Sequence, residues 1–209
     1  MWNPNQFAVV NPGQPVDLFQ PQYDRVNIGT TVTGDYVLFA NAKGASGITL
    51  IRGAATASVT KTDRDTSMTN SGVLPSKEFT CMGVNWGMAY ASSATNLGTP
   101  AIDRRLVACN GYMRFRVVDA DILILPLIAI PCLNPIMAVA ATFTSATDLA
   151  IYSEACGGAG QAIYRLPVPI TIQKNNNFNV TLTFDGTTTL TTSSDIYVFL
   201  HSFTRRPGQ

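Results

Sequence analysis

The last part of the chain alternates between apolar and polar residues as β-strands do. From Phe178 to Phe184 every even-numbered residue is apolar and every odd-numbered one is polar, which is the period of a strand with one buried face. Asp185-Gly186 follows and predicts a tight reversal, because glycine accepts positive φ without steric cost. Asp195 to Phe203 is apolar on both faces. We therefore expect a second sheet on one side of this strand and a further cover, such as another subunit, on the other.

Similar patterns, separated by turn residues, extend over the rest of the chain. Phe79 to Tyr90 predicts a long strand whose small residues allow close approach of another backbone. Leu166 to Ile172 is expected at a sheet edge, because Pro167 and Pro169 cannot donate to a ladder. The only predicted helix is short, near Ala146 to Glu154. The other predicted strands are Tyr23 to Ile28, Asp35 to Asn41, Ile48 to Arg52, Ala57 to Thr62, Tyr112 to Val118 with Arg114 and Arg116 facing outward, and Ile122 to Ile130 buried on both faces.

Three further segments complete the predicted organisation. Residues 1–22 are expected to form an extended arm, because four prolines fix φ there, and residues 23–209 to form one domain. The polar stretch Lys61 to Ser71 is expected to be an exposed loop. Ile122 to Phe143 is nearly continuous in apolar residues, but prolines interrupt it, which favours two strands and a turn over a transmembrane helix. About twelve strands with almost no helix predict an all-β sandwich or barrel.

The chain is poor in charge for its size. Charged residues make up 13% of it and hydrophobic residues 46%, whereas about 25% charged residues is usual. A surface with so little charge suits a protein largely covered by contacts. The net charge of +1 gives no electrostatic reason to bind nucleic acid, membranes or acidic substrates. No secretory signal is visible at the start, so synthesis in a reducing cytosol is expected.

The sequence contains no recognisable catalytic constellation. Its single histidine, His201, lies within a strand, there is no G-x-S-x-G motif, and one histidine cannot supply a metal site of the cupin type. Asp63/Asp65 and Asp119/Asp121 have a spacing compatible with calcium or acid–base roles, but solvated acids are the favoured interpretation. The four cysteines are expected to be free, mostly buried thiols: Cys81, Cys109, Cys132 and Cys156. The basic pairs Arg104/Arg105 and Arg205/Arg206 are expected to be solvated or to lie in an interface. We expect Gly157-Gly158-Ala159-Gly160 to form a flexible turn and the sequon Asn179-Val180-Thr181 to be unmodified. No catalytic, cofactor-binding or metal-binding residue is predicted, and the chain is not expected to be an enzyme.

The order of features resembles a known family. Gly72 to Phe79 leads into a long strand, Gly111-Tyr112-Met113-Arg114-Phe115 forms the next, and the chain closes with Ile196 to Phe203 and a short tail, Thr204 to Gln209. Over residues 70–209 this order is similar to that of jelly-roll capsid proteins of small tailless icosahedral bacteriophages. The resemblance implies a single jelly-roll β-sandwich with an N-terminal arm and extra hairpin strands, or alternatively a compact double jelly roll.

The same resemblance implies a structural function. The chain would be a capsid subunit that self-assembles into the shell of a virion in the host cytoplasm. Its partners would be copies of itself and other capsid proteins, with an internal membrane or packaging proteins next to the shell. Strong direct binding of nucleic acid is not expected, because the basic tail that would provide it is missing.

A binding module is the alternative to a shell subunit. A carbohydrate- or receptor-binding sandwich, such as a phage spike protein, would present aromatic side chains to its ligand. Trp86, Tyr90, Tyr197 and Phe199 are the candidates, although aromatic residues at strand period are more often part of a core.

Overall fold

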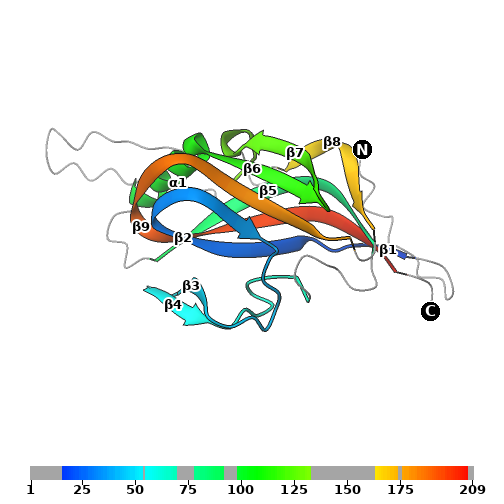
Figure 1. Cartoon of the computed structure of the whole chain (residues 1–209), viewed down its shortest axis with the longest axis horizontal. Helices are drawn as coiled ribbons and strands as arrows, with labels where there is room; N and C mark the ends of the chain where they lie inside the picture. Colours follow the sequence, from blue (N-terminus) through cyan, green and yellow to red (C-terminus); the bar gives the residue numbers. More distant parts are fainter. Residues whose placement is uncertain are drawn as a thin grey trace, which may run out of the picture.

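The fold is mostly β (Figure 1). The computed structural model describes residues 16–53, 55–69, 78–91, 98–132, 163–173 and 176–206. The elements are β1 (Val16–Phe19), β2 (Gln22–Leu38), β3 (Ile48–Arg52), β4 (Ala55–Val59), β5 (Phe79–Tyr90), α1 (Gly98–Asn110), β6 (Gly111–Val117), β7 (Ala120–Pro126), the short 3-10 helix η1 (Leu127–Ala129), β8 (Tyr164–Ile172) and β9 (Phe178–Arg206). β3 and β4 pair only with each other, and the remaining strands form one antiparallel sheet in the order β7-β6-β9-β5-β8, with β1 and β2 also paired to β9.

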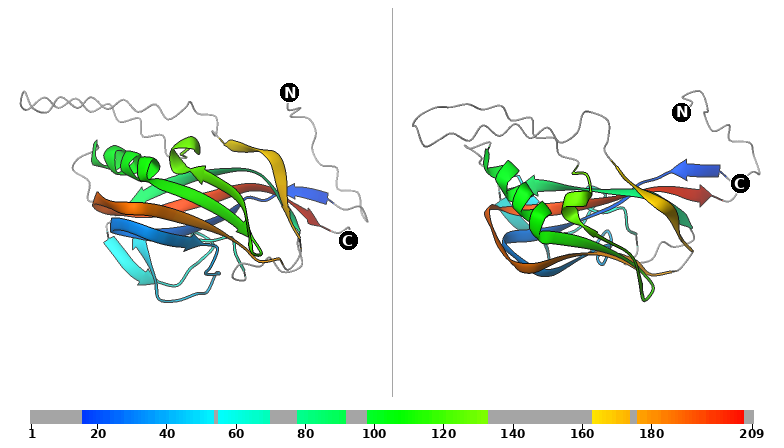
Figure 2. Two further views of the ribbon diagram at one scale, coloured as in Figure 1. Left: turned by 45° about the horizontal axis from the view of Figure 1, so that its top comes forward. Right: turned by 90° about the horizontal axis from the view of Figure 1, so that it is seen from above.

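The large sheet folds over on itself because its two longest strands bend together (Figures 1 and 2). The first half of β2 pairs with the second half of β9, and the second half of β2 pairs with the first half of β9. β5 and then β8 extend one layer beyond β9, whereas β6 and then β7 extend the other. The result is a two-layered β-sandwich, as the strand periods predicted.

The predicted tight reversal at Asp185-Gly186 is wrong, because β9 runs on through both residues. The chain instead turns gradually over the following residues. Between two successive paired positions, β9 runs from Thr189 to Ser194 whereas β2 runs only from Gly29 to Thr31. The extra residues in β9 form a bulge, and the bulge bends the two-stranded ribbon. Pairing of the whole segment with β2 overrides the local turn preference.

Helix α1 packs against this bend, and the sequence pattern did not predict it. Its Asp103 carboxylate is fully buried and accepts hydrogen bonds from the backbone N–H groups of Thr191, at 2.9 Å, and Thr192, at 3.2 Å. These N–H groups lie where β9 leaves its ladder with β2, so the carboxylate replaces partners that the bend removes. The predicted helix at 146–154 lies outside the described residues.

Aromatic and branched side chains from both layers form the core. Phe178 contacts the rings of Phe39, Phe79 and Phe115, with centroids 5.2 to 6.2 Å apart. Trp86 is 1% exposed, and its indole N–H donates to the carbonyl of Ile130 at 2.8 Å. These contacts connect β2, β5, β6 and β9, so the two layers share one core.

Two predictions about β5 and β8 are confirmed. β8 ends the strand order and is an edge strand, as its prolines required. On the small face of β5, a Cβ added to Gly83 would lie 2.8 Å from the carbonyl oxygen of Tyr164 and 2.5 Å from a side-chain carbon of Ile163. Glycine at this position therefore allows the close backbone approach that the pattern predicted.

The prediction that Ile122 to Ile130 is buried on both faces is wrong. β7 ends the strand order opposite β8, and of its residues only Leu123 and Leu125, which share one face, pack against the core. Ile122 and Ile124 are 49% and 57% exposed, and Ile128 of η1 is 65% exposed. None of the helices among the described residues has the length and apolarity needed to cross a bilayer.

The predicted N-terminal strands are present but are joined differently. Tyr23 to Ile28 and Asp35 to Asn41 both fall largely within the single strand β2, which continues through the bend. β3 has the predicted bounds, and β4 begins two residues earlier than predicted, at Ala55. Part of the predicted arm also forms a strand, because β1 pairs with the end of β9.

Candidate functional site

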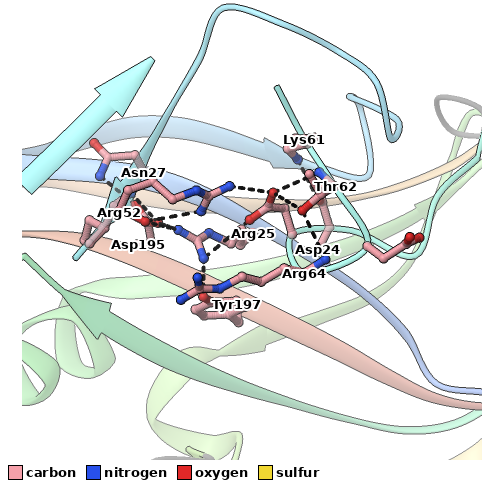
Figure 3. A network of polar contacts seen from close by, with 12 residues as sticks. Asp24, Arg25, Asn27, Arg52, Lys61, Thr62, Arg64, Asp195 and Tyr197 are labelled. Atoms are coloured by element: carbon pink, nitrogen blue, oxygen red, sulfur yellow. Dashed lines mark hydrogen bonds and ion pairs between the residues drawn. The ribbon is translucent and has the colours of Figure 1, made fainter. Parts of the chain in front are cut away.

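A network of buried charges is the most elaborate polar arrangement in the described part of the chain (Figure 3). At its centre is Arg25 of β2, which is 1% exposed. Its guanidinium donates to the Asp195 carboxylate at 2.6 Å and to the Ile51 carbonyl at 2.7 Å. The same side chain donates to the Tyr197 hydroxyl and lies over the Tyr197 ring. Arg25 thereby joins β2 and β9 to the small β3-β4 sheet.

Asp65 forms the second centre of the network. Its carboxylate accepts from Arg52 at 2.6 Å and from the backbone N–H of Thr62 at 2.9 Å, and it lies 3.5 Å from Arg25. Burial alone would raise the pKa of Asp65, but the hydrogen bonds from Arg52 and Thr62 outweigh burial and lower it. Asp65 is therefore ionised in the folded protein at neutral pH.

A third buried pair lies on the other face of β2. The Lys61 amino group contacts Asp24 at 2.5 Å, and both side chains are at most 3% exposed. The Asp24 carboxylate also accepts from the backbone N–H of Phe39 at 2.5 Å. Burial raises the pKa of Asp24, although Lys61 and the backbone hydrogen bonds act in the opposite direction.

Together these pairs fasten residues 39–68, hereafter the clamp segment, around the edge of β2. The clamp segment contains β3 and β4, and its backbone also joins β2, since the N–H of Ser67 donates to the carbonyl of Tyr23 at 2.9 Å. Because the clamp segment contacts both faces and the edge of β2, this edge is covered. A covered edge is protected from pairing with a strand of another chain. Ion pairs between its acids and cations thus attach the clamp segment to β2 and β9.

This arrangement corrects one prediction about the Lys61 to Ser71 stretch. Lys61, Asp65 and Thr66 are buried, so its described part, up to Thr69, is not simply an exposed loop. The polar residues point inward because each meets a complementary charge or backbone group contributed by β2 or by the clamp segment itself, and sequence periodicity does not reveal such partners.

The two predicted carboxylate pairs do not form metal sites. Asp63 is exposed and bonded to Lys43 at 2.7 Å, whereas its neighbour Asp65 is buried in the network. Asp121 contacts Arg116 at 3.0 Å, and Asp119 is exposed. Within the described ranges, no group of three or more His, Cys, Asp or Glu side chains is placed to hold a metal ion.

His201 lies on the outer face of β9, next to Phe19, whose ring is stacked on it with centroids 6.1 Å apart. Both imidazole nitrogens are buried without a hydrogen-bond partner. Burial lowers the pKa of His201 below its usual value. No acid or nucleophile is bonded to the ring, so the structure gives His201 no catalytic partner among the described residues.

The aromatic candidates for a sugar platform differ in exposure. Trp86 is buried in the core and cannot stack on a ligand. Tyr197 and Phe199 lie stacked on the outer face of β9, with centroids 6.2 Å apart, and Tyr90 is half-buried.

The remaining candidate residues do not converge on a site. None of the three described cysteines forms a disulfide, and only Cys81 is buried, which raises the pKa of its thiol to about 12. Arg104 is buried whereas Arg105 is exposed. Asn179 lies within β9, paired with Arg116 of β6. Gly157 to Gly160, Cys156 and the side chains of Arg205 and Arg206 lie outside what the structure describes.

The outer surface is apolar at many positions. The exposed large hydrophobic residues among those described are Phe19, Val37, Met82, Ile102, Val118, Ile122, Ile124, Ile128, Val168 and Phe203. They occur on both layers and on both edge strands β7 and β8.

Comparisons with known proteins identified no relative. No protein-family model matches the chain, and no curated protein or solved structure shows significant similarity to it.

Proposed function

We propose that this chain is a capsid subunit with a single jelly-roll fold, which assembles with copies of itself into the icosahedral shell of a bacteriophage virion in the host cytoplasm. The strand order supports the fold. One layer has the order β2-β9-β5-β8 and the other β2-β9-β6-β7, with the β2-β9 ribbon crossing between them. Such a folded ribbon, with half of each strand in each layer, is typical of the jelly roll. The described strands of the large sheet form one such ribbon and its flanking strands, which favours a single jelly roll over a double one.

The observation that carries the proposed function is an inverted distribution of charged and apolar side chains. Among the described residues, large hydrophobic side chains are exposed on both layers, whereas seven charged residues are buried: Asp24, Arg25, Lys61, Asp65, Asp103, Arg104 and Asp195. Burying charge in a chain that has so little leaves the outside with few ionised groups to keep a monomer soluble. Covering the apolar positions with further copies removes this liability.

The ion pairs also reduce the positive charge that the chain could offer to nucleic acid. Arg25, Lys61, Arg52 and Arg116 are each paired with an aspartate, so they present little uncompensated positive charge to a phosphate backbone. In the proposed shell, contact with the genome is therefore indirect, through packaging proteins or an internal membrane. Other capsid proteins would complete the particle.

The experiment is assembly of the purified full-length chain, followed by analytical ultracentrifugation and negative-stain electron microscopy over a range of concentrations. Closed particles that appear above a threshold concentration are the expected result. A stable monomer at the highest concentration reached would overturn the proposal.

A surface variant sharpens this test. Ile124→Lys places a charge on exposed β7. We expect it to raise the threshold concentration at least tenfold, which corresponds to a loss of about 1.4 kcal/mol in the free energy of association. Thr187→Lys is the matched control, because Thr187 is also exposed but is polar. Equal thresholds for the two variants would exclude β7 from the contacts.

A further inference from the structure

A row of aromatic rings runs along the outer face of the second half of β9 and continues onto the neighbouring strands. We call it the aromatic row, and its members are Phe19, Tyr23, Tyr197, Phe199, His201 and Phe203. Four of them are alternate residues of β9, and the other two lie directly across from it, Tyr23 opposite Phe199 and Phe19 opposite Phe203. The ring centroids of these two cross-strand pairs are 6.0 and 5.6 Å apart. The row is thus a continuous apolar surface and not a set of scattered side chains.

The row is covered at one end and open at the other. At the covered end, Tyr197 is bonded to Arg25 within the ion-pair network, and the Tyr23 hydroxyl donates to the carbonyl of Asp63. At the open end, Phe19 and Phe203 are 57% and 42% exposed. The clamp segment therefore covers only part of the row, and the open part presents exposed aromatic rings.

The polar groups of the row are incomplete as well. The two nitrogens of His201 are buried but have no hydrogen-bond partner. Asn85, which lies opposite Phe199 on β5, is fully buried, and its amide nitrogen and oxygen also lack partners. Buried polar groups without partners are rare in folded proteins and costly. These atoms are enclosed within the chain and do not reach a bound partner, so the exposed rings of Phe19 and Phe203 provide the contact surface of the open end.

We propose that the open end of the aromatic row binds residues 1–15 of a second copy of this chain as an extended, proline-rich segment. Aromatic surfaces are an established way of binding polyproline II segments, whose extended backbone lets proline rings pack against aromatic side chains. Residues 1–15 contain Pro12 and Pro15 at the three-residue spacing of that helix, as well as Trp2 and Phe7. They contain no charged side chain, which matches the uncharged row.

The direction of β1 explains why the second copy is favoured over the same chain. β1 is antiparallel to β9, with Phe19 opposite Phe203 and Val16 opposite Arg206. Val16 therefore lies farther from Phe199 along β9 than Phe19 does, and a straight continuation of the β1 direction would lead away from the row. Fifteen extended residues reach about 45 Å at ~3.1 Å per residue, so they can arrive at a neighbouring subunit without a reversal. Binding to the row of the same chain needs the segment to turn back on itself.

This inference rests on the proposed self-assembly, and photocrosslinking of the full-length protein tests it. A full-length chain that carries p-benzoylphenylalanine at Phe7 is mixed with full-length chain labelled with ¹⁵N, under conditions of assembly. The labelled chain is in large excess, so after irradiation mass spectrometry distinguishes crosslinks to another copy, which contain a ¹⁵N-labelled peptide, from crosslinks within one chain, which join two unlabelled peptides. We expect crosslinks to ¹⁵N-labelled peptides that contain Phe19 or residues 199–203.

A substitution on the row gives a second readout. Phe203→Ser removes an exposed ring and is expected to reduce the intermolecular crosslink at least tenfold. Val168→Ser is the matched control, because Val168 is 75% exposed on β8 and outside the row, and the crosslink should persist. Circular dichroism establishes that both variants are folded.

Each outcome is decisive. Crosslinks between copies at the row that are lost in Phe203→Ser support the inference. Crosslinks to the row of the same chain overturn the second copy as occupant, and crosslinks elsewhere, or none, overturn the row as the binding surface. Closed particles in electron microscopy together with either negative result would leave the proposed function standing while the inference fails.

Discussion

The two halves of β9 belong to the same strand but have different outer faces. In the first half the outer face carries Thr181 and Thr183, and Thr183 is bonded to Asp35 and Arg114 at the surface. In the second half it carries the buried Asp195 and then the aromatic row. The inner faces of both halves contribute apolar side chains to one core. The two outer faces therefore differ in what covers them. The partly exposed side chains of Asp35 and Arg114 lie over Thr183 in the first half, and the clamp segment covers part of the second half.

The largest expected effect comes from breaking the network in the second half. Asp195→Asn leaves the Arg25 guanidinium buried without its closest counter-charge, and we expect a loss of about 3 to 5 kcal/mol in the free energy of unfolding. Denaturant titration followed by circular dichroism measures it. A double variant, Arg25→Met with Asp195→Leu, should recover most of the loss, because it removes both charges. A loss below about 1 kcal/mol in the single variant would show that the network does not hold the clamp segment.

The bend between the two halves provides the next test. Asp103→Ala removes the carboxylate that accepts from Thr191 and Thr192, and it should lower the free energy of unfolding by about 2 to 3 kcal/mol, since these are hydrogen bonds to a charged group. Hydrogen exchange should show faster exchange at the amides of both threonines while β5 stays protected. Unchanged exchange at these amides would contradict the role assigned to Asp103.

A smaller effect is expected in the first half. Asp35 and Arg114 approach to 3.4 Å, and Asp35 is 53% exposed, so solvent screens the pair. A double-mutant cycle with Asp35→Ala and Arg114→Ala should give a coupling of about 0.2 to 1 kcal/mol. A coupling as large as that between Arg25 and Asp195 would remove the distinction between the two halves.

The smallest effect is the pH dependence contributed by His201. Its pKa is lowered in the folded state, so the unfolded chain binds a proton more readily, and stability declines as pH falls below the usual pKa of the imidazole. His201→Phe should remove this contribution. The measurement is the difference in unfolding free energy between the unsubstituted protein and His201→Phe at each pH from 8 to 5. Taking the difference cancels the contributions of the other titrating groups, which both proteins share. A difference that does not vary with pH would contradict a buried neutral histidine.

The sequence predicted some elements closely and others not at all. β5 has its predicted bounds, and β8 is the predicted edge strand, because alternation and proline act locally. α1 was missed because its residues include Gly98, Pro100 and Asn110 and lack a clear apolar stripe. Packing against the β9 bend, through Asp103, stabilises the helix in place of intrinsic preference.

The candidate surfaces show the same division. Low charge and an apolar final strand were visible in the sequence and led to the expectation of a second cover on β9. Within the clamp segment that provides part of this cover, the stretch that begins at Lys61 was expected to be an exposed loop, and the exposed β7 was expected to be buried. Both errors concern which element lies next to which, and alternation along a strand contains no such information.

The sequence by itself determined that this chain is mostly β and that one face of each main strand is apolar, because side-chain alternation follows directly from backbone geometry. Only the tertiary structure decided which charges are buried and where the apolar surface remains open. The bend of β2 with β9 brings Asp24, Arg25 and Asp195 to residues 39–68, which are far away along the chain. Such charges are stable in the interior only when partners from these distant segments meet them.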